Sequence, residues 1–154
     1  MAKVIRVMGD LSGTRTDVAN LPAAGFKVKS GTTSSIKKGY LVIKDGSNAG
    51  YAKAAPDGTA STSVILGIAT SDSNETASAD GNVNVAWLQN LVVEIFANTP
   101  GSLATSKLLS SYTLKVSSGS YLLDEATTTN GFIRPLDYDN TTNGKCTAVI
   151  TCNT

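Results

Sequence analysis

The fold class is decided by residues 80–87, which read Asp80-Gly81-Asn82-Val83-Asn84-Val85-Ala86-Trp87. Apolar Val, Val and Trp occupy every second position, and this period of two is typical of a β-strand with one face in solvent. The Asp-Gly pair at the start favours a tight turn, because both residues reach positive φ at low cost. Residues 26–29, Phe26-Lys27-Val28-Lys29, alternate in the same way. We therefore expect half-buried strands joined by short turns.

Strand-like segments recur along the whole chain, each rich in β-branched or aromatic residues and bounded by Gly, Asn, Asp or Ser. We expect strands at residues 3–8, 25–29, 40–44, 51–55, 63–70, 82–87, 92–97, 112–116, 120–123, 131–134 and 145–152. Turn dipeptides lie between them, at Asp45-Gly46, Asp57-Gly58, Asp80-Gly81, Asn130-Gly131 and Asn143-Gly144. Only residues 99–111 offer a helical start. The chain is predicted to be mostly β, a compact β-barrel or β-sandwich-like body with at most one or two short helices.

Composition divides the chain into three parts. Residues 10–20 are polar and rich in Gly, Ser and Thr, so we expect residues 1–24 to form an extended N-terminal arm and its link. A shift near Pro100 predicts a main β-domain at residues 25–101. Residues 102–154 then supply additional C-terminal strands, packed on the first part or forming a small second lobe.

The charge of the chain excludes two classes of partner. Charged residues make up 16% of the sequence and the net charge is +1. An average globular domain has about 25% charged residues, so this surface must consist largely of Ser, Thr, Asn and Gly. We expect no binding to nucleic acid or to an acidic membrane surface. The N-terminus lacks the apolar core of a secretory signal peptide, and no apolar run approaches the roughly 18 residues of a membrane-spanning helix, so we expect the protein in a cytoplasm.

The sequence offers little for catalysis. It contains no histidine, which removes the Ser-His and Cys-His pairs and the commonest zinc ligand. Asp137, Asp139 and Asn140 match the first oxygen positions of a calcium loop but lack the Gly and Glu that complete it. We interpret them as a polar turn in which Asp side chains accept hydrogen bonds from nearby amides. We predict no enzyme activity, no cofactor and no metal.

Three further residues have structural interpretations. Cys146 and Cys152 lie in one expected strand, about 20 Å apart when extended, so they cannot pair within it. Their even spacing places them on one face with Ala148 and Ile150, and we interpret them as small buried hydrophobes. Trp87 is in phase with the apolar positions of its strand. We interpret it as a core residue, with an interface anchor as the alternative.

Residues 38–101 show a distinctive order of features. Gly39-Tyr40-Leu41-Val42 is followed by Ala54-Ala55-Pro56-Asp57-Gly58-Thr59, then by Val64-Ile65-Leu66-Gly67-Ile68-Ala69, and then by Asp80-Gly81 with Val83-Asn84-Val85. This order resembles the head-decoration proteins of tailed phages, the group typified by the phage lambda decoration protein. The pattern consists of small residues and turns and carries no catalytic signature. It implies a compact β-rich body.

The resemblance also implies a function. Proteins of this family are structural virion proteins that bind the exterior of the expanded capsid, sit there as trimers and clamp neighbouring major-capsid subunits. The partners that it implies are the major capsid protein and further copies of this chain, assembled in the host cytoplasm. It further implies a capsid-binding arm made of Lys3, Val4, Ile5, Arg6, Val7 and Met8. Strand addition of this kind needs an extended segment and an open sheet edge.

An alternative function belongs to a different class. The strands after residue 102 depart from the family, whose prototype is shorter. A phage tail, fibre or surface-adhesin module that binds host glycan through Trp, Tyr and Asn side chains would also lack catalytic motifs. An exposed cluster of Trp87 or tyrosines would favour glycan binding, and a buried Trp87 would favour the capsid.

Overall fold

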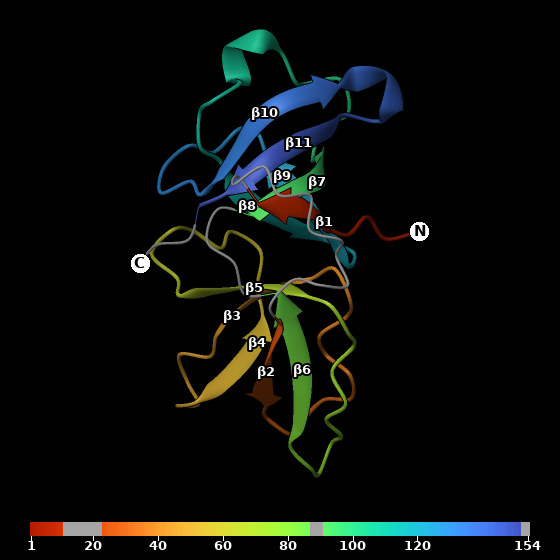
Figure 1. The fold of residues 1–154 in the computed structure, drawn as a ribbon, viewed down its shortest axis with the longest axis vertical. Coiled ribbons are helices and arrows are strands. Elements are labelled where there is room, and N and C mark those ends of the chain that lie inside the picture. Colours follow the sequence, from red (N-terminus) through yellow and green to blue (C-terminus); the bar gives the residue numbers. More distant parts are fainter. Residues whose placement is uncertain (11–22, 87–90, 152–154) are drawn as a thin grey trace.

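The computed structural model describes residues 1–10, 23–86 and 91–151. Its strands form two bodies stacked along the long axis of the molecule, a closed barrel and a six-stranded sheet (Figure 1). The described residues contain two short 3-10 helices, η2 (Thr105–Lys107) and η3 (Asn140–Thr142), and no longer helix. The prediction of a mostly β fold with at most one or two short helices is confirmed.

The barrel follows the strand order β2-β4-β3-β5-β6. Its strands are β2 (Ala23–Val28), β3 (Leu41–Lys44), β4 (Tyr51–Ala54), β5 (Ile65–Ala69) and β6 (Gly81–Ala86). In β6, Val83 and Val85 are buried while Asn82 and Asn84 are exposed, as the alternation predicts. The valines pack inside the barrel, and they form a core with the strands opposite.

Gly67 lies where β5 passes closest to β6. Its φ is +147°, and a Cβ at this position would lie 2.0 Å from the carbonyl oxygen of Ala86. Only glycine avoids both the backbone strain and this overlap. The glycine between Leu66 and Ile68 is therefore a packing requirement of the barrel.

The second body is a sheet in the order β10-β11-β7-β9-β8, with β1 also paired to β7. Its strands are β1 (Arg6–Asp10), β7 (Leu91–Ala97), β8 (Thr113–Ser117), β9 (Ser120–Asp124), β10 (Ile133–Asp139) and β11 (Lys145–Ile150). β7 is its central strand, because it pairs with β11 along one edge and with β1 and β9 along the other. The first domain expected at residues 25–101 includes β7. The change from barrel to sheet instead falls between β6 and β7.

One hydrophobic core crosses from the barrel into the sheet. Leu41, Ile43 and Ile68 of the barrel share it with buried residues of β7, β8, β9 and β11. At the same joint, the rings of Tyr40 and Tyr121 stack with their centroids 4.3 Å apart. The Tyr121 hydroxyl donates to the carbonyl of Ala55 over 2.9 Å. The two bodies are therefore one packed unit.

A barrel loop extends this joint along the edge strand β8. Asp57 accepts a hydrogen bond from the amide of Val116 and forms an ion pair with Lys115, both over 2.8 Å. The Gly58 amide donates to the carbonyl of Leu114 over 3.0 Å. This loop covers β8 with backbone contacts, which is a common protection of an edge strand.

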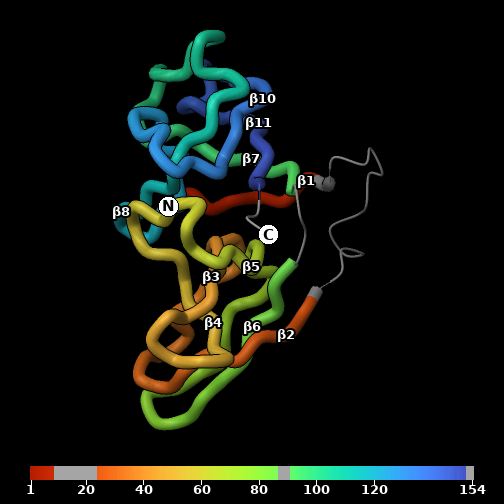
Figure 2. Tube along the Cα trace, turned by 90° about the vertical axis from the view of Figure 1, so that its left-hand side faces the viewer, coloured from red at the N-terminus to blue at the C-terminus, as the bar shows by residue number. Residues whose placement is uncertain are grey.

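The N-terminal segment lies between the two bodies (Figure 2). β1 runs antiparallel to β7, and Ile5 and Val7 are buried in the shared core. The Ile5 amide donates to the carbonyl of Gly39 in the barrel over 3.0 Å, and the Lys3 carbonyl accepts from the Tyr121 amide over 2.8 Å. Within the extended arm expected at residues 1–24, residues 6–10 thus pair with β7, and Ile5 and Val7 contribute to this core. The polar link expected at residues 11–20 lies outside the described residues.

This placement predicts that Ile5 is needed for stability. Ile5→Ala should lower the free energy of unfolding by about 2–4 kcal/mol, because it removes a buried side chain and leaves a cavity. Met8→Ala is the matched control: Met8 is 47% exposed in the same N-terminal segment, and its truncation should change stability by less than about 0.5 kcal/mol. Urea unfolding of both variants measures the difference. Equal stability of the two variants would show that Ile5 is not part of the core, and residues 3–8 would then be a free arm.

Candidate functional site

The residues expected to bind the capsid divide between the two sides of the N-terminal segment. Ile5 and Val7 face the core, whereas Val4, Arg6 and Met8 are exposed. Only the exposed three can meet a partner while the strand stays in place. Val4 also packs on the barrel, since a Cβ at Gly39 would lie 2.8 Å from the Cβ of Val4.

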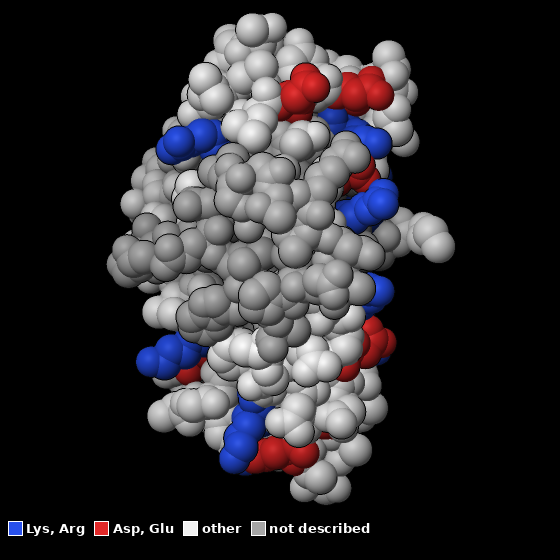
Figure 3. All heavy atoms as spheres, in the orientation of Figure 1, with Lys and Arg blue, Asp and Glu red and all other residues white. Residues whose placement is uncertain are grey.

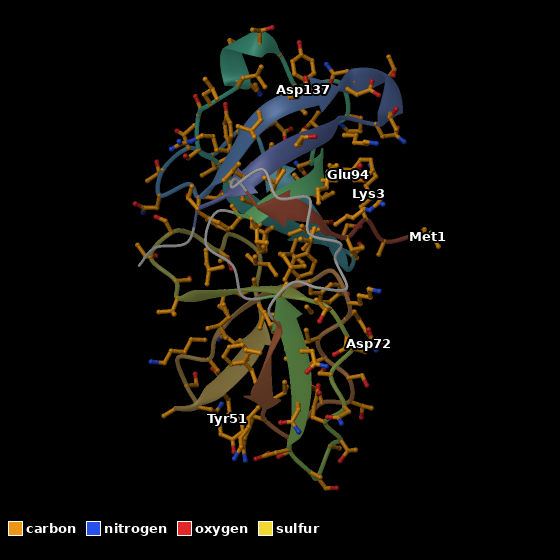
Figure 4. The ribbon with its side chains drawn as sticks, in the orientation of Figure 1. Met1, Lys3, Tyr51, Asp72, Glu94 and Asp137 are labelled. Atoms are coloured by element: carbon orange, nitrogen blue, oxygen red, sulfur yellow. The ribbon has the colours of Figure 1, made fainter. Side chains whose placement is uncertain are left out.

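Lys3 is held against the sheet rather than extended into solvent. Its ammonium group lies 4.8 Å from the ring centroid of Phe96, a cation–π arrangement. Its amide donates to the hydroxyl of Ser120 over 3.0 Å. Figure 4 labels Lys3 and Glu94 on the sheet body, and Asp72 and Tyr51 on the barrel.

In a chain without histidine, acid–base catalysis would depend on acidic side chains. The acidic side chains of this protein instead hold the backbone in place. Among the acidic side chains that the structure describes, nine accept a hydrogen bond from a main-chain amide: Asp45, Asp57, Asp72, Glu75, Asp80, Asp124, Glu125, Asp137 and Asp139. Glu94 instead pairs with Lys145 over 3.1 Å. Hydrogen bonds that lower the pKa of a carboxylate stabilise its charged form and make it a poor proton donor near neutral pH, as they do for Asp45, Asp57, Asp72, Glu75, Asp80, Glu125 and Asp139.

Glu75 is the most deeply buried of these carboxylates, with 1% of its surface exposed. Its Oε1 accepts hydrogen bonds from both the amide and the hydroxyl of Ser35, joining residues 31–36 to residues 73–76. Burial raises the pKa of Glu75, but the hydrogen bonds from Ser35 and Ser73 outweigh it and hold the pKa below its ordinary value. Glu75 thus fastens two loops of the barrel.

Glu125 has the corresponding role in the sheet. Its two oxygens accept from the amides of Asn98 and Thr99, over 3.0 and 2.8 Å. Burial raises its pKa, and the hydrogen bonds that it accepts lower it further than burial raises it. Glu125 therefore holds the backbone directly after the last residue of β7.

Asp80 holds the far end of the barrel. Its carboxylate accepts from the Tyr51 hydroxyl over 2.6 Å and from the Ser30 amide over 2.9 Å, and it pairs with Lys29 over 3.0 Å. These hydrogen bonds, that from Tyr51 foremost, keep the pKa of Asp80 far below its ordinary value. The Asp-Gly dipeptide was expected as a turn, and the structure adds the partners of its side chain.

Of the cluster expected to form a polar turn, residues 137–139 belong to β10, and the turn begins at Asn140 with η3. Asp139 caps η3, accepting from the Thr141 amide over 2.9 Å and from the Thr142 hydroxyl over 2.9 Å. Asp137 accepts from the amide of Tyr138 over 2.8 Å. Within the described residues, no three His, Cys, Asp or Glu side chains are grouped so that they could hold a metal ion.

The described tyrosines are occupied by structural contacts. Tyr40 and Tyr121 stack at the joint, Tyr112 is buried, and the Tyr51 hydroxyl donates to Asp80. Tyr138 is partly buried against the core. Trp87 lies outside the described residues, so the prediction that it is buried stays a prediction.

Cys146 is a core residue, as the sequence predicts. It is 1% exposed and faces inward together with Ala148 and Ile150. Burial raises the pKa of its thiol to about 12, which makes it a poor nucleophile and metal ligand. Cys152 lies outside the described residues.

A scan against protein-family models finds none that matches this chain, and searches of curated proteins and of solved structures also find no match. The likeness of residues 38–101 to head-decoration proteins thus consists of the order of sequence features quoted above. No helix in the described ranges is long and apolar enough to cross a membrane.

Because several carboxylates have lowered pKa values, we expect the folded protein to lose stability in acid. The groups whose pKa is lowered by their hydrogen bonds are Asp45, Asp57, Asp72, Glu75, Asp80, Glu125 and Asp139. Because their folded pKa values lie below the unfolded values of about 3.9 for Asp and 4.3 for Glu, their contribution is complete above about pH 5. It is lost as the pH falls through about 4 and below.

Urea unfolding at about pH 7, 5 and 3 measures this dependence. The midpoint should be similar at the first two values and clearly lower at the third. As a control, about 0.5 M NaCl at pH 7 should not reproduce the loss, because most donors are neutral amides and hydroxyls that salt does not screen. An unchanged midpoint at pH 3 would contradict the assigned role of the carboxylates.

Proposed function

We propose that this protein is a phage capsid decoration, or cement, protein: a non-enzymatic structural protein that binds the outside of an expanded capsid and clamps neighbouring major-capsid subunits. The observation that carries the proposal is the construction of the barrel. Residues 38–101, whose feature order resembles decoration proteins, supply four of its five strands, β3 to β6. The glycine of their Leu-Gly-Ile motif is required where β5 meets β6.

The joint between barrel and sheet supports this role. A clamp must hold its shape while the subunits on either side of it are pushed apart. The shared core, the Tyr40–Tyr121 stack and the Asp57–Lys115 contact connect the two bodies at several points. Close-packed interiors have low compressibility, so force applied to one body is transmitted to the other.

The surface chemistry is consistent with attachment by shape and backbone. Charged side chains of both signs lie along the margins of the face in Figure 3, and much of its described surface is uncharged. The net charge is +1. Weak contacts of this kind hold firmly when a lattice repeats them, because each bound copy adds to the avidity.

The partner of this protein in the proposal is the major capsid protein, with homotrimers on the exterior of the virion. Val4, Arg6 and Met8 are the capsid contacts proposed within the N-terminal segment, since they are its exposed side chains. The segment would then bind with its buried side chains in place.

Co-sedimentation of the purified protein with expanded, undecorated heads of the phage that encodes it tests the proposal. Saturable binding at a fixed ratio to capsid subunits is expected, and unexpanded heads provide the control for specificity. Light scattering gives the mass of the free protein. No binding to expanded heads would contradict the proposal, and a positive glycan screen in that case would favour the tail, fibre or adhesin alternative.

A further inference from the structure

Leu109 adopts a backbone conformation that leucine rarely takes. Its φ is +64°, in the left-handed region, and its side chain is 68% exposed. The other described non-glycine residues with positive φ are Ser34, Ser118, Asn130 and Asn143, all small or polar. Asn and Gly enter this region far more easily than a large apolar residue does. Leu109 therefore costs free energy in two ways, through its positive φ and through the exposure of its apolar side chain to water.

Hydrogen bonds from Leu109 and from the residue before it hold this backbone conformation. The Leu109 amide donates to the carbonyl of Pro135 in β10 over 2.9 Å. Just before it, the Leu108 amide donates to Thr105 over 3.1 Å and closes the turn of η2, the coil at the top of Figure 1. The fixed backbone therefore sets the direction of the Cα–Cβ bond of Leu109.

A second irregularity lies in β10, next to the residue that holds the Leu109 amide. The pairing of β10 with β11 shifts register between Pro135 and Asp137, so Leu136 lies in a β-bulge. Its side chain is 36% exposed. Bulges redirect side chains, and the carbonyl that fixes Leu109 belongs to the residue directly before Leu136. A left-handed residue and a bulge thus present two leucines at one end of the sheet, which we call the leucine tip.

We propose that the leucine tip, Leu109 and Leu136, is an anchor that inserts into an apolar pocket on a subunit of the lattice that this protein decorates. The inference rests on the proposed capsid function and names a contact outside the N-terminal segment. Strain and exposed apolar side chains at one spot are typical of binding sites rather than of structural positions. Exposed Arg134, whose guanidinium lies 3.5 Å from the Ser111 hydroxyl, supplies a polar rim.

The size of the tip decides between a lattice subunit and a second free copy. A stable complex of two free proteins buries about 800 Å² on each partner, and two leucine side chains provide a small fraction of that. Such a contact cannot hold two copies together in solution. It is sufficient where the same contact is repeated over a lattice and assisted by other contacts of each bound copy.

The variant Leu109→Asn tests the anchor, because it should weaken binding without destabilising the fold. Asn accepts positive φ more readily than Leu, so the variant should unfold at the same temperature as the unchanged protein or at a higher one. Its affinity for expanded, undecorated heads should fall roughly tenfold or more, the effect of losing one buried leucine at an interface. Leu136→Asn should act in the same direction.

Val64→Asn is the matched control, because Val64 is 55% exposed on the barrel and has no unusual φ. It should bind heads within about twofold of the unchanged protein. Affinities come from co-sedimentation at a series of protein concentrations, and light scattering records the mass of each free variant.

The outcomes distinguish the two proposals. Unchanged binding by a folded Leu109→Asn variant, with the unchanged protein binding heads, overturns the anchor and leaves the capsid function standing. Failure of the unchanged protein to bind heads overturns the capsid function and the anchor with it. If the unchanged protein is oligomeric in solution and Leu109→Asn makes it monomeric, the tip is a contact between copies and the lattice anchor is wrong.

Discussion

The hydrophobic core that passes from the barrel into the second sheet is the constraint on which the rest of the structure depends. Leu41, Ile43 and Ile68 face the sheet from the barrel, so neither body buries its apolar surface alone. Burial of such surface is the main favourable contribution to folding. The N-terminal strand fills the remaining gap with Ile5 and Val7, and its hydrogen bonds reach Gly39 in the barrel and Tyr121 in the sheet.

This constraint shapes what the molecule can do. In the described part of the chain, Glu75 and Glu125 hold loops through amide hydrogen bonds, and Tyr121 packs at the joint. A rigid, nearly neutral body with short irregular edges is suited to repeated contacts on a lattice. The decoration proposal and the leucine tip follow from this distribution of fixed and exposed groups.

Much of the fold could be predicted from local patterns, and the parts that could not depend on distant contacts. Period-two alternation located β6, and Asp-Gly and Asn-Gly pairs marked turns, with Asn130 and Asn143 at positive φ. Composition also marked residues 3–8 as a strand, but it cannot tell which strand will pair with them. The partner, β7, lies more than eighty residues away, and this pairing turns the expected arm into core. The leucine tip was missed for the same reason, because strain and a bulge appear only in the folded backbone.

The most direct test of the shared core is hydrogen exchange measured by mass spectrometry over a series of urea concentrations below the unfolding midpoint. If the core joins the two bodies, amides in β3 and β5 of the barrel and in β7 and β11 of the sheet should exchange through one common opening with the same free energy. The same dependence on urea is expected for both sets of peptides. Exchange of the barrel peptides at clearly lower urea, with the sheet still protected, would show two independently stable bodies and contradict this account.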